Sequence, residues 1–185
     1  MRNQLIAILR HGTDLPDGER PLADGEADFL ATTMAPQVRH ALHGDPEEIH
    51  SSPLLRARQT ATAIAGTNPV EHATLAKYPK YDDAVMAYAK AHRIDSTEAF
   101  FRVMGLAAGL KLAYDTGGYN LMAFIEHLGN HPAERILVVT HGGSMEAFAE
   151  RLMVDFSQVP TFKKGEGFVV RWDGLEREFV SFLRR

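Results

Sequence analysis

Residues Leu5–Thr13, with the sequence LIAILRHGT, decide the fold predicted for this chain. The apolar run Leu5–Ile8 is short and is soon followed by a glycine, which is typical of a buried β-strand. Arg10 and His11 follow at the C-terminal end of that strand. Because ligands of open α/β sheets bind outside the carboxyl ends of the strands, these two residues predict a binding site at that edge. A guanidinium beside an imidazole indicates an anion site that contains a nucleophile.

Two further strand–loop–helix junctions have the same organisation. Residues Arg135–Thr140 form a second buried-strand pattern, and it runs into His141-Gly142-Gly143. Residues Glu48–Ala61 predict a short strand, a turn and the start of a helix that carries Arg56 and Arg58. Each junction therefore delivers His or Arg side chains to what should be one edge of one sheet.

The composition limits the classes of protein that need consideration. A chain of 185 residues is the size of one domain with a full core. The net charge of -4 argues against a nucleic-acid binder. The chain has no cysteine, which excludes disulfides and thiolate metal sites and fits a reducing compartment. No signal-peptide pattern or membrane-length apolar run is present, so we expect a cytoplasmic protein without a membrane partner. The oligomeric state stays open.

The pattern of apolar residues, glycines and prolines predicts an α/β fold. We expect a three-layer αβα sandwich with a mainly parallel sheet, formed by a single domain over 1–185, and a small helical cap inserted at about 77–118. Helices are predicted at about 26–42, 54–65 and 119–128, at 144–154, and as a pair within 84–112 that joins near 92–95 and has a cap-like Ser96–Glu98. Strands are predicted at 5–8, 48–51, 70–75 and 135–140, with a terminal hairpin at 168–182 that turns at Asp173-Gly174.

Together the three junctions resemble the histidine phosphatase superfamily, also called the phosphoglycerate-mutase-like superfamily. Its Arg-His-Gly after the first strand is similar to Arg10-His11-Gly12. Its Ser-Pro-Leu-x-Arg-Ala-x-Gln-Thr-Ala stretch is similar to Ser52–Ala61, and its later His-Gly-Gly to His141-Gly142-Gly143. The resemblance covers most of the chain and is weakest at about 77–120. It implies hydrolysis of phosphomonoesters through a phosphohistidine.

The resemblance also assigns roles to the motif residues. A phosphate monoester is a dianion with a poor leaving group, so its cleavage needs charge stabilisation, an in-line nucleophile and a proton for the departing oxygen. His11 is the expected nucleophile, and Arg10 and Arg56 are the expected forked donors to the phosphoryl oxygens. His141 is expected to stabilise the charged transition state. The backbone N–H groups after it, beginning at Gly142, should add a favourable dipole.

The remaining roles are assigned by position within the motifs. The family's pocket arginine directly precedes the Ala, so it is Arg56; Arg58 should point about 200° away around the helix and lie on the surface. The family's general acid falls in a stretch similar to Tyr78–Asp83. Counting from the proline of this stretch favours Asp83, with Asp82 as the second choice.

The chain departs from the family pattern next to the nucleophile and in the cap. Thr13-Asp14 follows Arg-His-Gly, and Asp14 is expected to turn away from the phosphate or to pair with a cation. The loop over 13–20 is short. The cap offers few cations that could bind the carboxylate of phosphoglycerate. They are Lys90, Arg93, Arg102 and Lys111.

The expected substrate is a small phosphorylated metabolite, and three alternatives stay open. They are a phosphoglycerate-mutase-type phosphotransferase, a protein phosphohistidine phosphatase, and a catalytically impaired phosphate-ligand binding protein on the same fold. Glu146 occupies the last position of Gly142–Glu146, so that stretch is not a Gly-x-Ser-x-Gly elbow and a serine esterase is disfavoured. The chain has no His-Glu-x-x-His spacing, and we predict no metal and no other cofactor.

Overall fold

The computed structural model describes residues 3–14, 21–154 and 161–185, and its centre is a six-stranded sheet. The strands are β1 (Gln4–Arg10), β2 (Glu48–Ser51), β3 (Val70–Glu71), β4 (Arg135–Thr140), β5 (Gly167–Trp172) and β6 (Arg177–Leu183). Their order is β3-β2-β4-β1-β5-β6, and the first four are mutually parallel. Strand β5 pairs antiparallel with β1, and β6 pairs antiparallel with β5. The predicted mainly parallel α/β sheet is confirmed.

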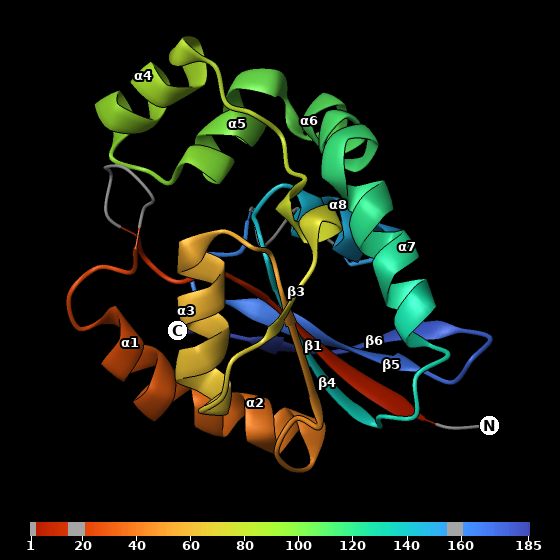
Figure 1. The fold of residues 1–185 in the computed structure, drawn as a ribbon. Coiled ribbons are helices and arrows are strands. Elements are labelled where there is room, and N and C mark those ends of the chain that lie inside the picture. The colour runs from red at the N-terminus through yellow and green to blue at the C-terminus, as the bar shows by residue number, and fades with distance from the viewer. Residues whose placement is uncertain (1–2, 15–20, 155–160) are drawn as a thin grey trace.

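Helices cover both faces of the sheet, which completes the three predicted layers (Figure 1). On one face lie α1 (Glu26–Phe29), a π-helical turn (Leu30–Met34), α2 (Ala35–Leu42) and α3 (Leu55–Ala65). On the other lie α7 (Tyr119–Leu128) and α8 (Ser144–Arg151). Because side chains alternate along a strand, Ile6 and Ile8 of β1 belong to the second core, and Ala7 and Leu9 belong to the first.

The segment between the β3 region and α7 forms a group of helices beside the sheet (Figure 1). It contains α4 (Asp83–His92), α5 (Ser96–Met104) and α6 (Leu106–Ala113), which share a small core around Val85 and Phe100. The prediction of two helices here is wrong, because Gly105, with a φ of 77°, separates α5 from α6. The cap residue of α5 is Asp95 rather than Ser96–Glu98, since its carboxylate accepts from the backbone N–H of Thr97.

Several other element boundaries differ from the predicted ones for local reasons. The helix predicted over 26–42 contains the π turn. This turn directly precedes α2, whose second residue is Pro36, and a proline cannot donate a backbone hydrogen bond within a helix. The predicted edge strand over 70–75 is reduced to β3 and continues as a 3₁₀ turn, Ala73–Ala76. The turn of the terminal hairpin spans 173–176 rather than the two predicted residues. Within it, the Asp173 carboxylate accepts from the N–H groups of both Leu175 and Glu176 at 2.8 Å.

None of the helices in the described ranges is both long enough and apolar enough to cross a bilayer. The limits of the domain, 1–185 with a cap at about 77–118, stay a prediction. Of the predicted loop over 13–20, residues 15–20 lie outside the described residues.

Candidate active site

A pocket of about 390 Å³ lies where β1 and β4 end. Arg10 is the last residue of β1 and His11 follows it; Arg56 lies in the first turn of α3, and His141 directly follows β4. All four side chains line this pocket, and each retains 6% or less of its exposure. The structure therefore brings together residues that are separated by up to 131 positions in the chain, as the strand-end argument predicted.

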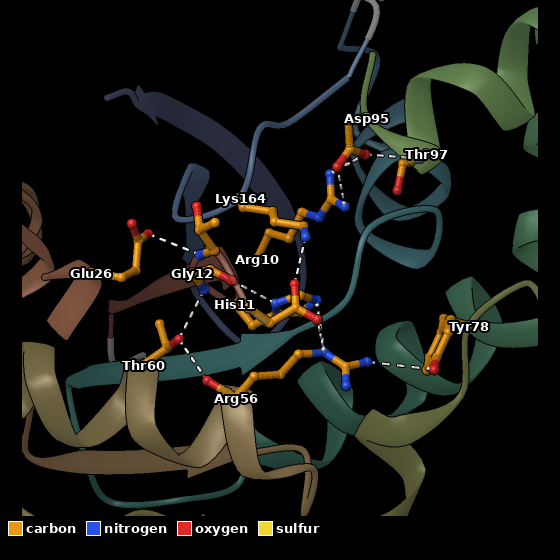
Figure 2. A network of polar contacts seen from close by, with 12 residues as sticks. Arg10, His11, Gly12, Glu26, Arg56, Thr60, Tyr78, Asp95, Thr97 and Lys164 are labelled. Atoms are coloured by element: carbon orange, nitrogen blue, oxygen red, sulfur yellow. Dashed lines mark hydrogen bonds and ion pairs between the residues drawn. The ribbon is translucent and has the colours of Figure 1, made fainter. Parts of the chain in front are cut away.

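The local contacts of His11 fix which nitrogen is available for chemistry (Figure 2). Its Nδ1 lies 2.8 Å from the carbonyl oxygen of Gly12, so Nδ1 must carry the proton and donate it. The lone pair is then on Nε2, which accepts from the Nε–H of Arg56 at 3.1 Å. Burial, followed by the neighbouring His141 and the two arginines, lowers the pKa of His11 well below its usual value. His11 is thus a neutral imidazole with a nucleophilic nitrogen at physiological pH.

His141 lies beside the nucleophile, with 5.1 Å between the two ring centroids. Its Nε2 is 2.9 Å from the hydroxyl of Ser52, and the ring of Tyr78 packs on it at 4.5 Å between centroids. Nδ1 is buried and has no hydrogen-bond partner among the described residues. Burial and the charges of Arg56 and Arg10 lower the pKa of His141 well below its usual value. When the Ser52 hydroxyl donates to Nε2, Nδ1 carries the ring proton and can donate a hydrogen bond to a phosphoryl oxygen.

Arg10 is anchored by two residues outside β1, and Figure 2 shows one of them, Asp95. Its guanidinium donates to the carbonyl oxygen of Phe162 at 2.8 Å and forms an ion pair with Asp95 at 2.9 and 3.1 Å. Burial opposes ionisation of Asp95, but the adjacent Arg10 outweighs it and the pKa of the carboxyl is lowered. The Nε of Arg10 is buried without a partner within the described ranges, so this N–H can still bind an anion. Asp95 caps α5, and the ion pair therefore fastens that helix to the pocket.

Arg56 and Arg58 have the different environments that their helix positions predicted. Arg56 points into the pocket, and one of its terminal nitrogens lies 3.5 Å from the Tyr78 hydroxyl (Figure 2). Arg58 is partly exposed and pairs with Glu71 at 3.4 Å on the surface. The hydroxyl of Thr60 connects α3 to the nucleophile loop, because it donates to the Arg56 carbonyl at 2.7 Å and accepts from Gly12 N–H at 2.8 Å.

The structure does not bring the predicted general acid into the pocket. Asp83 is exposed in the first turn of α4 and does not line the cavity. Asp82 is also exposed, and its carboxylate caps α4 by accepting from Val85 N–H at 2.9 Å. The count from Pro79 therefore leads to two residues at the start of α4 that do not line the pocket. The role of either residue as general acid stays a prediction.

Asp14 is the carboxylate that the structure places at the pocket instead. It pairs with Lys164, as its expected need for a cation predicted, and its Oδ2 lies 3.8 Å from Arg56 Nε. Lys164 and Lys80 line the pocket too and add positive charge to that of the arginines. Sequence reasoning missed both lysines, since nothing local links them to a site.

The start of α8 supplies less than the expected set of backbone donors. Gly142 lines the pocket, in agreement with the sequence analysis. The N–H of Gly143, however, donates to the carboxylate of Glu146 at 2.6 Å and is not available to a ligand. Burial raises the pKa of Glu146.

The sequence analysis did not identify two side chains that position pocket residues. Ser52, which contacts His141, lies within a recognised motif, whereas the only local signal for Asp95, which pairs with Arg10, is its place before a helix.

The described residues contain no group of three or more His, Asp and Glu side chains arranged to hold a metal ion. The pocket instead offers two imidazoles, two guanidiniums and two ammonium groups around a single described carboxylate. This arrangement suits an oxyanion, because N–H groups of guanidinium, ammonium and imidazole match its oxygen atoms. The expected forked contact from Arg10 is not seen, because Asp95 and the Phe162 carbonyl occupy its two terminal nitrogens. The fold and the pocket thus define an α/β protein with a buried neutral imidazole at an anion site.

Comparison with known proteins identifies the family to which this arrangement belongs. Residues 6–180 match the sequence profile of the histidine phosphatase superfamily (branch 1). The chain belongs to the histidine phosphatase superfamily. No curated protein sequence matched it.

Solved structures with the same fold include phosphatases and a mutase. One is a mycobacterial glucosyl-3-phosphoglycerate phosphatase, with a TM-score of 0.68, 14% identity and 100% coverage of both chains. Another is a phosphoglycerate mutase from Bacillus anthracis, with a TM-score of 0.67, 17% identity, and coverage of 97% of this chain and 92% of that one. A third is the protein histidine phosphatase SixA in complex with tungstate, with a TM-score of 0.64, 17% identity, and coverage of 98% and 97%. At these identities the likeness concerns the fold.

Proposed function

We propose that this protein is a phosphatase that hydrolyses a small phosphorylated metabolite through a phosphohistidine on His11. The observation that carries the proposal is the state of His11: Nδ1 is held by the Gly12 carbonyl, and Nε2 bears a lone pair inside a cationic pocket. The substrate is a phosphate ester, because the pocket's donors match a phosphoryl group and its size matches a small molecule.

The proposed reaction has two displacements at phosphorus. In the first, Nε2 of His11 attacks phosphorus, the P–N bond forms, and the P–O bond to the alcohol breaks. Before this attack, Arg56 exchanges its hydrogen bond with Nε2 for one with a phosphoryl oxygen, which frees the lone pair, and Arg10 offers its Nε–H to the phosphoryl group. His141 donates to another oxygen as the charge develops. In the second displacement, water attacks phosphorus, the P–N bond breaks, and inorganic phosphate leaves.

One observation favours a second candidate, a protein phosphohistidine phosphatase. Neither Asp82 nor Asp83 lines the pocket. A phosphoramidate needs less help from an acid than an alkyl ester does, because its leaving imidazole is a far weaker base than an alkoxide. The helices of the cap weigh against a large substrate, since α5 is fastened to the pocket by the ion pair of Asp95 with Arg10.

The mutase alternative receives no support from the four cap cations that the sequence analysis considered. Arg102 pairs with Glu98 and Lys111 pairs with Asp115, both along their own helices. None of Lys90, Arg93, Arg102 and Lys111 lines the pocket, whereas Lys80 and Lys164 do. A phosphotransferase would also have to protect the phosphohistidine from water until an acceptor binds.

A substrate panel with a matched pair of variants tests the proposal. We expect wild-type protein to release inorganic phosphate from p-nitrophenyl phosphate and from at least one phosphorylated metabolite. His11→Ala should lose this activity, whereas Arg58→Ala, a change in the same helix as Arg56 but outside the pocket, should keep it. Phosphate release only from a phosphohistidine peptide would favour the second candidate, and transfer to a second hydroxyl would favour a mutase. Binding of phosphate without turnover would show an impaired binder.

A further inference from the structure

Asp14 is the only Asp or Glu among the described residues that line the pocket. Resting on the proposed function, we propose that Asp14 is the proton carrier of the reaction. In this role it gives a proton to the leaving oxygen in the first displacement and takes one from water in the second.

The position of Asp14 connects it directly to the nucleophile. Its Oδ2 lies 3.8 Å from the Nε of Arg56, and the same Nε–H donates to His11 Nε2 at 3.1 Å. The Asp14 side chain is 6% exposed, so it is largely withdrawn from bulk water. The carboxylate of Asp14 and the nucleophilic nitrogen of His11 therefore both lie beside the Nε of Arg56.

Three other proton-bearing side chains of the pocket, Tyr81, Tyr78 and Lys164, have partners of their own. Tyr81 is hydrogen-bonded to Thr97 at 2.8 Å, and burial raises its pKa, which makes it a weaker acid. The Tyr78 hydroxyl lies 3.5 Å from a terminal nitrogen of Arg56, and its ring packs on His141 with 4.5 Å between the centroids. The ammonium group of Lys164 is paired with Asp14 itself.

Substrate binding supplies the proton that Asp14 needs. In the structure, Lys164 pairs with the carboxylate and Arg56 Nε lies 3.8 Å from it. A bound phosphoryl group would compete with Asp14 for these two cations, and the proposed role requires that Asp14 takes up one proton at this point. Substrate and proton are therefore expected to bind together.

The proton balance of the two displacements is then closed. As the P–O bond breaks, the proton of the Asp14 carboxyl passes to the leaving oxygen, which departs as a neutral alcohol. Asp14 is left ionised beside the phosphohistidine. As water attacks phosphorus, its proton passes to Asp14, the P–N bond electrons return to His11 Nε2, and phosphate leaves.

Kinetics with two leaving groups test this role. In Asp14→Asn, kcat/KM for an alkyl phosphate should fall by about 10²–10⁴-fold, the usual contribution of general acid catalysis. For p-nitrophenyl phosphate, whose leaving group needs little protonation, the loss should stay within about tenfold. Asp83→Asn is the matched control and should behave as wild type on both esters. Equal losses on the two esters, or no loss on either, would overturn the role of Asp14.

A binding measurement separates proton transfer from a structural role. We expect titration with tungstate, calorimetrically and in buffers of different ionisation enthalpy, to show about one proton fewer taken up by Asp14→Asn than by wild type. Asp14→Glu keeps the carboxyl group and should restore the leaving-group pattern, even if its rates are lower. Unchanged proton uptake in Asp14→Asn would contradict the proposal. In all these outcomes a phosphohistidine on His11 still forms, so only its absence from wild type would count against the proposed function.

Discussion

Removing the carboxylate of Asp95 should destabilise the protein more than removing an ordinary helix cap. Asp95 both caps α5 and neutralises the buried Arg10 through contacts of 2.9 and 3.1 Å. Breaking a buried ion pair by removing one partner costs about 3–5 kcal/mol. Because the Asp95 side chain is 23% exposed, water can partly replace it, and we expect about 2–3 kcal/mol for this part. With the lost cap, Asp95→Ala should cost about 3–4 kcal/mol.

The assay is thermal and urea unfolding of Asp95→Ala beside Asp82→Ala. Asp82 caps α4 in the same way, accepting at 2.9 Å, but it is exposed and has no ion pair among the described residues. Asp82→Ala should therefore cost only about 1 kcal/mol. For a chain of this size the two values correspond to losses in Tm of about 10 °C and about 3 °C. Equal losses in the two variants would refute the reasoning that the ion pair with Arg10 stabilises the cap.

Three further predictions concern the pocket. Gly142→Ala should lower kcat/KM by about 10²-fold, because its Cβ would lie 2.9 Å from Arg10 Nε and displace the guanidinium; steady-state kinetics with a normal unfolding curve would show this. Activity should survive EDTA, since arginines and His141 supply the charge stabilisation; a loss that Mg²⁺ or Zn²⁺ reverses would disprove this. The free energy of unfolding should fall as the pH drops below about 6.5. The pKa values of His11 and His141 are lowered in the folded protein, so the unfolded chain binds more protons in this range. Urea unfolding at several pH values should show the free energy of unfolding changing by up to about 3 kcal/mol per pH unit.

The sequence was most informative where an apolar run ends at a polar motif. The ranges predicted for β2, β4 and α7 agree with the structure, because short buried runs and clear terminators leave little choice of boundary. The same logic located Arg10, His11 and His141, since the carboxyl ends of parallel strands meet at one edge.

Features that depend on tertiary contacts were not predictable. Asp95 and Arg10 are 85 positions apart, and no local pattern connects them. Asp14 and Lys164 are 150 positions apart, and their pairing depends on how the chain returns to the pocket after α8. The position of Asp83 outside the pocket was not predictable either, because counting along a stretch does not show that Asp82 caps a helix that begins at Asp83.

The central claim is that His11 Nε2 becomes phosphorylated. The most direct test is a rapid quench of wild-type protein with ³²P-labelled substrate, followed by mapping of the labelled peptide. The account predicts an acid-labile, base-stable label on His11, formed at a rate that matches turnover and absent from His11→Ala. Label on another residue, or turnover in wild type without any phosphoenzyme, would contradict it.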